Sequence, residues 1–270
     1  MTEISDAFRG LKEKNEAALI AYVTVGDPHV SKTAELVGAL VEGGVDIVEL
    51  GIPFSDPIAD GPTIQNAVLR SLTGGCRPPD VFEVASTIRE RYKIPLVAMT
   101  YYNPVFRIGV SRFLKLGKKA GISGLIIPDL PIEESASYRE ECASNEMDTI
   151  FLAAPSTDAA RLKRIADKTS GYLYLVSLYG VTGARTMLAE DALQLIKRCD
   201  NFLPDKLPFA VGFGISKPNQ VKSIIHAGAD GVIVGSAFVN IIADNAHSTR
   251  RAGQKLQKLA RKLKRATRIS

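Results

Sequence analysis

Residues 19–50, LIAYVTVGDPHVSKTAELVGALVEGGVDIVEL, contain one complete strand, helix and strand unit. Residues 19–25 and 45–50 are nearly continuous apolar runs, and residues 32–41 between them place apolar side chains at helical spacing. Continuous apolar runs are typical of strands that are covered on both faces, as in a parallel sheet. The stretch therefore predicts two parallel strands joined by a right-handed helical crossover.

The same alternation continues along the rest of the chain. Six more strands are predicted at residues 96–100, 125–127, 149–152, 172–177, 209–211 and 231–234. Helices are predicted between them at residues 81–91, 110–120, 133–144, 159–168, 190–197 and 218–227. Eight such units without a linker or a compositional break predict one α/β domain over residues 1–270, a closed (β/α)8 or TIM barrel. An open doubly wound sheet is the alternative. Extra helices are predicted before the first strand, at residues 4–14, and after the eighth unit, at residues 252–266.

The positive charge of the chain gathers at its C-terminal end. The 270 residues carry 34 basic and 29 acidic side chains, for a net charge of +5. Residues 245–270 hold nine of the basic and none of the acidic residues, so the rest of the chain is slightly acidic. Apolar residues recur among these cations at helical spacing, which predicts a basic C-terminal helix docked by its apolar face. Because no aromatic residues or nucleic-acid motif accompany the cations, we expect no nucleic-acid partner.

Other function classes are excluded by composition. No apolar run approaches the ~18 residues of a membrane-spanning helix, and the polar N-terminus lacks the apolar core of a signal peptide. We therefore expect a cytoplasmic protein without a membrane partner. Three scattered cysteines (Cys76, Cys142 and Cys199) and three scattered histidines show no metal-ligand spacing, so no metal is expected.

Two carboxylates flank the loop that follows the second strand. Glu49 lies near the end of this strand, and by alternation it shares a face with Val45 and Ile47, so we expect it to point into the barrel mouth. A carboxyl group in an apolar mouth is poorly solvated, so its pKa should rise and it can exchange a proton near neutral pH. Asp60 reaches the same cavity if the loop folds back. On spacing alone, structural roles are favoured over catalysis, with Glu49 as an ion-paired strand end and Asp60 as a turn or cap residue.

Small residues gather at the ends of the last two strands. Gly214 follows the seventh strand, and Gly235 and Ser236 follow the eighth. In a (β/α)8 barrel these loops and the N-terminus of a short helix often bind phosphate, because backbone amides approach its oxygens where no Cβ intervenes. On the sixth strand, Tyr172 and Tyr174 alternate with apolar neighbours and are predicted to face the lumen. The glycine-containing loop that follows, residues 180–187, is suited to a lid.

The segment from Glu49 to Gln65, ELGIPFSDPIADGPTIQ, resembles the signature of the tryptophan synthase α chain. The resemblance continues through residues 21–28, 101–104, 127–131, 180–183 and 212–216, and it covers nearly the whole chain. It implies retro-aldol cleavage of indole-3-glycerol phosphate to indole and glyceraldehyde 3-phosphate, with no metal or organic cofactor in this chain.

The resemblance also implies roles for individual residues. Glu49 would protonate indole C3 and then deprotonate the side-chain hydroxyl, Asp60 would hydrogen-bond the indole N–H, and Tyr174 would assist. Tyr22, Ile64 and Met99 correspond to positions around the indole ring. The implied phosphate donors are Gly183, Gly214, Gly235 and Ser236.

Family members act with a β chain that uses pyridoxal phosphate to join indole to serine, so the resemblance implies an α2β2 heterotetramer. The surfaces that face this partner correspond to Asp56, Pro57, Asn103 and Pro104. Two departures stand out: Tyr22 replaces an expected phenylalanine, and Leu178-Tyr179 replaces an Arg-containing pair, which bears on loop closure and coupling. Two other functions stay open, an isomerase for another sugar phosphate and a noncatalytic barrel that only binds the β chain.

Overall fold

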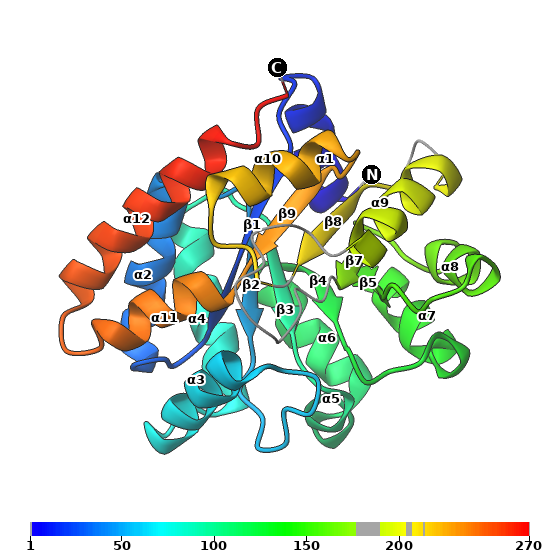
Figure 1. Ribbon diagram of the computed structural model, residues 1–270. Helices are drawn as coiled ribbons and strands as arrows, with labels where there is room; N and C mark the ends of the chain where they lie inside the picture. The colour runs from blue at the N-terminus through cyan, green and yellow to red at the C-terminus, as the bar shows by residue number, and fades with distance from the viewer. Residues whose placement is uncertain (1, 177–189, 204–206, 213, 270) are drawn as a thin grey trace.

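The computed structural model describes residues 2–176, 190–203, 207–212 and 214–269, and its strands lie inside a layer of helices (Figure 1). The described strands pair in parallel in the order β5-β4-β3-β2-β1-β9-β8-β7-β6. Their bounds are β1 (Ala18–Thr24), β2 (Ile47–Gly51), β3 (Leu96–Met99), β4 (Ile122–Ile126), β5 (Asp148–Ile150), β6 (Leu152–Ala153), β7 (Leu173–Val176), β8 (Phe209–Gly212) and β9 (Gly231–Val234).

The two ends of this strand order belong to one segment of the chain. Only Phe151 separates β5 from β6, and β5 pairs with β4 while β6 pairs with β7. The order therefore returns to the segment where it began, and the sheet is closed. The predicted fifth strand at residues 149–152 corresponds to this interrupted segment. The (β/α)8 barrel is thus confirmed, and the open-sheet alternative is wrong.

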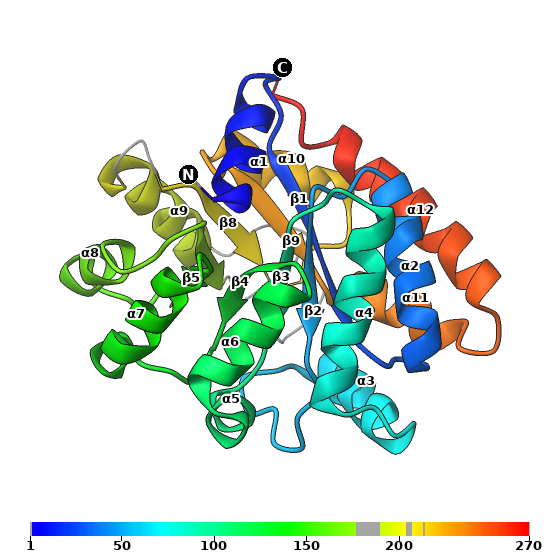
Figure 2. The ribbon, with the colours of Figure 1, turned by 180° about the vertical axis from the view of Figure 1, so that it is seen from behind.

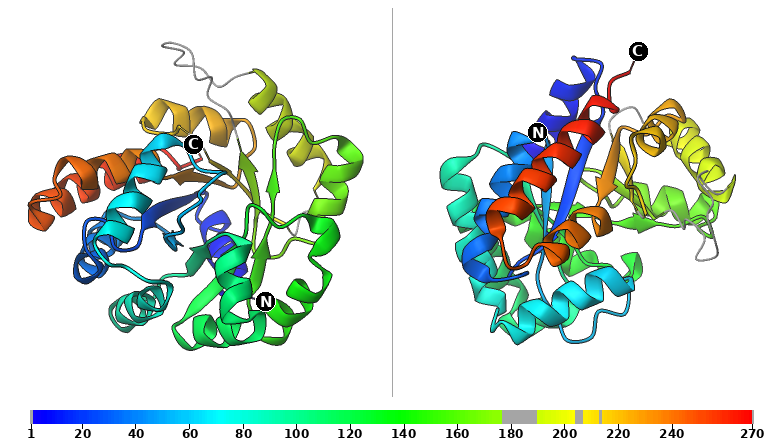
Figure 3. Two further views of the ribbon diagram at one scale, coloured as in Figure 1. Left: turned by 90° about the horizontal axis from the view of Figure 1, so that it is seen from below. Right: turned by 60° about the vertical axis from the view of Figure 1, so that its left-hand side comes forward.

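Helices surround the strands on all sides (Figures 2 and 3). Those predicted between strands are α2 (Val30–Glu42), α4 (Pro78–Arg91), α6 (Val110–Lys119), α7 (Ala136–Ser144), α8 (Ala159–Ala166), α9 (Glu190–Phe202) and α10 (Pro218–His226), with the short 3-10 helix η1 (Ile132–Glu134) before α7. Three helices were not predicted: α3 (Pro62–Thr73), α5 (Tyr102–Ile108) and α11 (Ser236–Asp244). Each begins in a proline- or glycine-containing motif that reads as loop, and each follows a strand at the mouth of the barrel.

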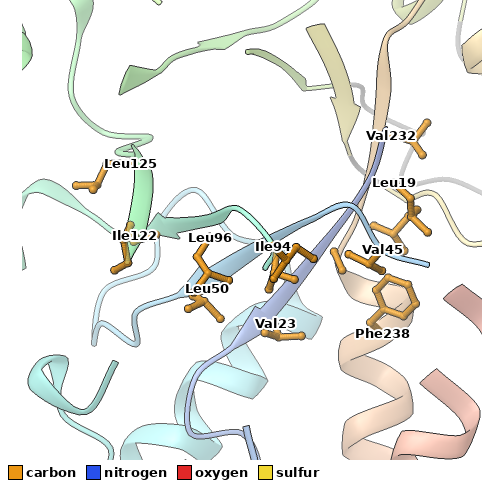
Figure 4. Close-up of a cluster of buried hydrophobic side chains, with 14 of the residues drawn as sticks. Leu19, Val23, Val45, Leu50, Ile94, Leu96, Ile122, Leu125, Val232 and Phe238 are labelled. Carbon is orange, nitrogen blue, oxygen red and sulfur yellow. The ribbon is translucent and has the colours of Figure 1, made fainter. Parts of the chain in front are cut away.

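The core has an outer and an inner part because successive strand residues face opposite ways. The outer part, between sheet and helices, includes Leu19, Leu50 and Phe238 (Figure 4). The inner part fills the lumen with side chains such as Ile47, and α1 (Glu3–Lys12) inserts Ile4 and Phe8 into it at the closed end. The predicted inward direction of Val45 is wrong: β2 begins at Ile47, and Val45, which precedes it, packs in the outer part.

Both predicted terminal helices are present. The basic helix α12 (Thr249–Arg265) packs along α2 and buries Ala252, Leu256, Ala260 and Leu263, while most of its cations are exposed. The Ala17 N–H donates to the Thr267 carbonyl at 2.9 Å, which ties the C-terminal end of the chain to the segment between α1 and β1 (Figure 1). No helix within the described ranges is long and apolar enough to cross a membrane.

Candidate active site

A cavity of about 380 Å³ opens at the C-terminal ends of the strands, beside α3 and α11. Most of the predicted site residues line it: Tyr22, Asp60, Ile64, Met99, Tyr174, Gly214, Gly235 and Ser236. Gly183 and residues 178–187, with the expected lid, lie outside the described residues. The sequence therefore identified the walls of one cavity from six separate segments.

A larger cavity of about 800 Å³ lies at the opposite, N-terminal end of the strands. Its walls carry two ion pairs, Arg89 with Glu3 at 2.7 Å and Lys118 with Glu146 at 2.8 Å. Chemistry in this fold takes place at the C-terminal ends of the strands, so the smaller cavity is the candidate active site.

Glu49 lies just below this cavity and is fully buried. The Tyr172 hydroxyl donates to Glu49 Oε1 at 2.5 Å, whereas Oε2 has no hydrogen-bond partner among the described residues. Burial raises the pKa of Glu49 to about 7, and the Tyr172 hydrogen bond opposes this rise. Glu49 faces the lumen as predicted, but its carboxyl points away from the cavity walls, toward Tyr172.

Asp60 is held in the cavity wall by a tyrosine that sequence reasoning did not select. The Tyr101 hydroxyl donates to Asp60 Oδ2 at 2.9 Å and accepts from the Ala59 N–H at 2.9 Å. Gln65 Nε2 on α3 donates to the Asp60 carbonyl oxygen at 2.8 Å. Burial raises the pKa of Asp60, and the Tyr101 hydrogen bond lowers it. The feature of the sequence that could have identified Tyr101 is its position just after the third strand.

Tyr22 and Tyr174 lie in the cavity wall because two glycines make room for them. A Cβ atom at Gly51 would overlap the Tyr22 hydroxyl, and one at Gly212 would overlap the Tyr174 hydroxyl. Each ring therefore reaches across the neighbouring strand, β2 for Tyr22 and β8 for Tyr174. Burial raises the pKa of both tyrosines, and the nearby charges of Glu49 and Asp60 raise it further. The Glu49 and Asp60 carboxyl groups thus lie close enough to both rings to influence their titration.

Another part of the cavity wall, beside Tyr22, is formed by backbone. Gly235 is the N-cap of α11, and Ser236 is its first residue. The first N–H groups of a helix have no partner within the helix, and the helix dipole favours an anion at this end. Gly214 has a φ of +71°, a conformation that suits glycine. An anionic group would find favourable electrostatics at this wall.

The predicted partner-facing residues lie on the rim around this mouth, after β2 and β3. Asp56 and Pro57 line a groove of about 390 Å³ together with Ile58 and Leu69, whose exposures are 80% and 63%. On α5, Asn103 is exposed and Phe106 beside it is 67% exposed, whereas Pro104 is buried. Across the described part of the chain, no cluster of His, Cys, Asp and Glu is arranged to hold a metal ion.

A (β/α)8 barrel with one carboxyl group in the wall of its mouth cavity, a second buried below that cavity and a helix N-terminus beside it has the features of a barrel enzyme. A family model described as "Tryptophan synthase alpha chain" matches residues 8–268. The tryptophan synthase alpha chain of Methanosarcina barkeri is 50% identical over 262 residues, which cover 97% of this chain and 96% of that one.

Solved structures show the same likeness. A structure of the tryptophan synthase a2b2 complex from Pyrococcus furiosus matches with 42% identity and a TM-score of 0.87, covering 92% of this chain and 98% of that one. A structure of tryptophan synthase from M. tuberculosis matches with 34% identity and a TM-score of 0.88, covering 99% of both chains. This chain belongs to the tryptophan synthase alpha chain family, lyases that cleave indole-3-glycerol phosphate.

Proposed function

We propose that the mouth cavity binds indole-3-glycerol phosphate and that Glu49 and Asp60 carry out its cleavage to indole and glyceraldehyde 3-phosphate. The observation that carries this proposal is the buried Glu49 carboxyl, whose pKa of about 7 lets it give and take a proton at neutral pH. The apolar walls around Tyr22, Ile64 and Met99 suit an indole ring, and the N-terminus of α11 suits its phosphate.

The cleavage needs two proton transfers at one end of the ring. Protonated Glu49 gives its proton to indole C3, and the ring becomes a positively charged indolenine. The resulting carboxylate then removes the proton from the hydroxyl on the adjoining side-chain carbon. The bond between C3 and this carbon breaks, its electron pair returns to the ring, and the products are indole and an aldehyde.

Asp60 and Tyr174 stabilise the charged intermediate. The ionised Asp60 carboxylate accepts the indole N–H, so its negative charge faces the positive charge that develops on the ring. Tyr174 lies across the lumen from β2 and packs beside the ring. Phosphate held at Gly235 and Ser236 fixes the substrate's other end, which keeps C3 in line with Glu49.

Glu49 must turn before it can act. In the structure its carboxyl is hydrogen-bonded to Tyr172 and does not line the cavity. A rotation of the side chain toward the mouth brings the carboxyl to the substrate, and the unpartnered Oε2 lowers the cost of leaving the buried position.

The same proposal includes a partner. The Pyrococcus furiosus relative forms an a2b2 complex. We propose that a tryptophan synthase β chain docks on the rim around Asp56, Pro57 and Asn103, receives the indole, and holds the pyridoxal phosphate, so that this chain needs no cofactor. Exposed Ile58 and Phe106 on that rim supply apolar area for the contact.

The test is an indole-release assay with purified chain and indole-3-glycerol phosphate, with and without a β chain. We expect release by the chain alone and faster release in the complex. No release under either condition would overturn the proposal and leave the chain a noncatalytic partner. Membership of this family argues against the isomerase alternative. The apolar wall is a second argument, because another sugar phosphate has no aromatic ring for it to bind.

A further inference from the structure

The Tyr22 hydroxyl lies over β2, the strand that carries Glu49. The Tyr22 ring is 7% exposed and spans the space between two glycines. A Cβ added at Gly235 would lie 3.5 Å from Tyr22 Cβ, and a Cβ added at Gly51 would overlap the hydroxyl oxygen. The ring therefore starts beside the anion-binding wall and ends with its hydroxyl over β2.

The pairing register of β1 and β2 places the Tyr22 hydroxyl nearer the barrel mouth than Glu49. Tyr22 pairs with Glu49 across β1 and β2, and both side chains belong to the lumen. Gly51 follows Glu49 by two residues, so it shares the same face and lies about 6.6 Å nearer the mouth. The Tyr22 hydroxyl, at the level of Gly51, is thus between the Glu49 backbone and the cavity.

The present partner of Glu49 is on the other side. Tyr172 precedes β7 and packs at a tilt against Phe8 of α1, with ring centroids 5.7 Å apart, at the closed end of the lumen. Glu49 therefore has one tyrosine hydroxyl below it and another above it.

We propose that Tyr22 is a positioning residue that receives Glu49 in its working orientation. When the carboxyl turns from Tyr172 toward the substrate, the Tyr22 hydroxyl donates a hydrogen bond to it and holds it at the level of indole C3. This inference rests on the proposed function and adds the residue that controls its proton donor.

Two observations make Tyr22 the suitable partner. Its hydroxyl now contacts Thr24 Oγ1 at 3.3 Å, which is long for a hydrogen bond between hydroxyl groups, so little is lost when it turns to a carboxylate. The Tyr174 hydroxyl lies over Gly212 on β8, and in the strand order β8 is separated from β2 by β9 and β1. Tyr22 alone of these two tyrosines adjoins the strand of Glu49.

The test replaces Tyr22 by phenylalanine, which keeps the ring and removes only the hydroxyl. We expect kcat for indole release to fall about 3- to 20-fold with KM little changed, the effect of one lost hydrogen bond in the working orientation. A hydrogen-bond donor to the charged carboxylate lowers the pKa of that carboxyl group. Removal of the Tyr22 hydroxyl should therefore move the basic limb of the kcat profile up by about 0.5 to 1 pH unit.

A double-mutant cycle separates positioning from packing. Tyr172→Phe frees the carboxyl from its lower partner, so the loss caused by Tyr22→Phe should shrink in the Tyr172→Phe background. Tyr138→Phe is the control, because it removes a buried hydroxyl on α7, away from the cavity, and should leave kcat and its pH profile unchanged.

Each outcome has a distinct meaning. In a crystal structure with a noncleavable phosphorylated indole analogue, Glu49 should lie within hydrogen-bond distance of Tyr22 Oη. If Tyr22→Phe matches an active wild type in kcat and pH profile, or if its effect adds independently to that of Tyr172→Phe, the inference is wrong and the proposed function stands. If the wild type itself releases no indole, the proposed function fails.

Discussion

Each of the two carboxyl groups at the mouth receives one side-chain hydrogen bond among the described residues, from Tyr172 for Glu49 and from Tyr101 for Asp60. These partners are 123 and 41 residues away in the sequence. Alternation along a strand predicts which way a side chain faces, but not which distant side chain it meets. For this reason the sequence predicted both carboxyl groups and the lumen-facing Tyr172, but neither hydrogen bond.

The raised pKa of Glu49 predicts a pH-dependent gain in stability for Glu49→Gln. The folded chain holds this proton up to about pH 7, whereas the unfolded chain loses it near 4.5, so wild-type stability falls as pH rises through this window. At pH 8 this effect lowers the free energy of unfolding of the wild type by about 3 kcal/mol. Glutamine does not titrate, so the variant shows no such decrease. Urea unfolding should show that the free energy of unfolding of Glu49→Gln, relative to that of the wild type, increases by up to this amount between pH 4 and pH 8. An equal difference at both pH values would contradict the assigned pKa.

The Tyr101 hydrogen bond should set the pH at which activity falls on the acid side of the profile. Asp60 acts as the carboxylate, so activity should fall as pH drops through its pKa. Tyr101→Phe removes a donor to the charged form, and the limb should move up by about one unit. The ring contact with Phe54, at a centroid distance of 5.5 Å, stays. The check is the pH profile of kcat/KM, with neighbouring Tyr102→Phe as control. An unmoved limb would mean that Tyr101 does not govern Asp60.

At the scale of elements, α3 shows why the sequence prediction was incomplete. Residues 62–73 follow a run rich in proline and glycine that reads as loop, yet they form a helix with Pro62 at its first position, where proline is favoured. Long-range contacts hold it: Arg70 makes a bidentate ion pair with Asp27 at 2.8 Å, and Ser71 donates to the Val25 carbonyl. The regular helices between strands, whose apolar spacing is strong, were predicted to within a few residues.

The buried ion pair predicts that α3 depends on Arg70. Asp27 is 1% exposed, so Arg70→Met leaves its charge buried without a partner. Because Arg70 itself is 34% exposed, we expect a loss of roughly 2–4 kcal/mol, somewhat less than for a fully buried pair. Indole release should fall as well, since α3 carries Ile64 and Gln65. Lys118→Met, which breaks an exposed pair with Glu146, should cost less than about 1 kcal/mol in the same unfolding measurement. Equal losses would contradict the structural role of Arg70.

At the scale of the whole molecule, barrel closure brings segments from both halves of the chain to one mouth. The first half supplies Tyr22, Asp60 and Ile64, and the second half supplies Tyr174 and the glycine wall. Repetition of strand and helix predicted this closure from the sequence, because eight parallel units have few other arrangements. The break between β5 and β6 could not be predicted, since an interruption at the single residue Phe151 leaves the apolar run of residues 149–152 unchanged.

The shared mouth predicts that phosphate stabilises the folded chain. Inorganic phosphate at 100 times its dissociation constant should raise the free energy of unfolding by about 2.7 kcal/mol. Gly235→Val should abolish this gain, because a side chain at the N-cap of α11 obstructs the helix N-terminus. Gly10→Val on α1, where an added Cβ meets nothing within 4 Å, should keep it. Protection that persists in Gly235→Val, measured by thermal unfolding, would place the phosphate elsewhere, such as in the cavity at the closed end.

The pH dependence of indole release shows whether Glu49 is the proton donor. Because protonated Glu49 is the active form, kcat/KM of the wild type should fall as pH rises through about 7. Glu49→Gln, with the same shape and no proton to give, should be about 100- to 10,000-fold slower at pH 7. A folded Glu49→Gln variant that releases indole at nearly the wild-type rate would show that Glu49 is not the proton donor.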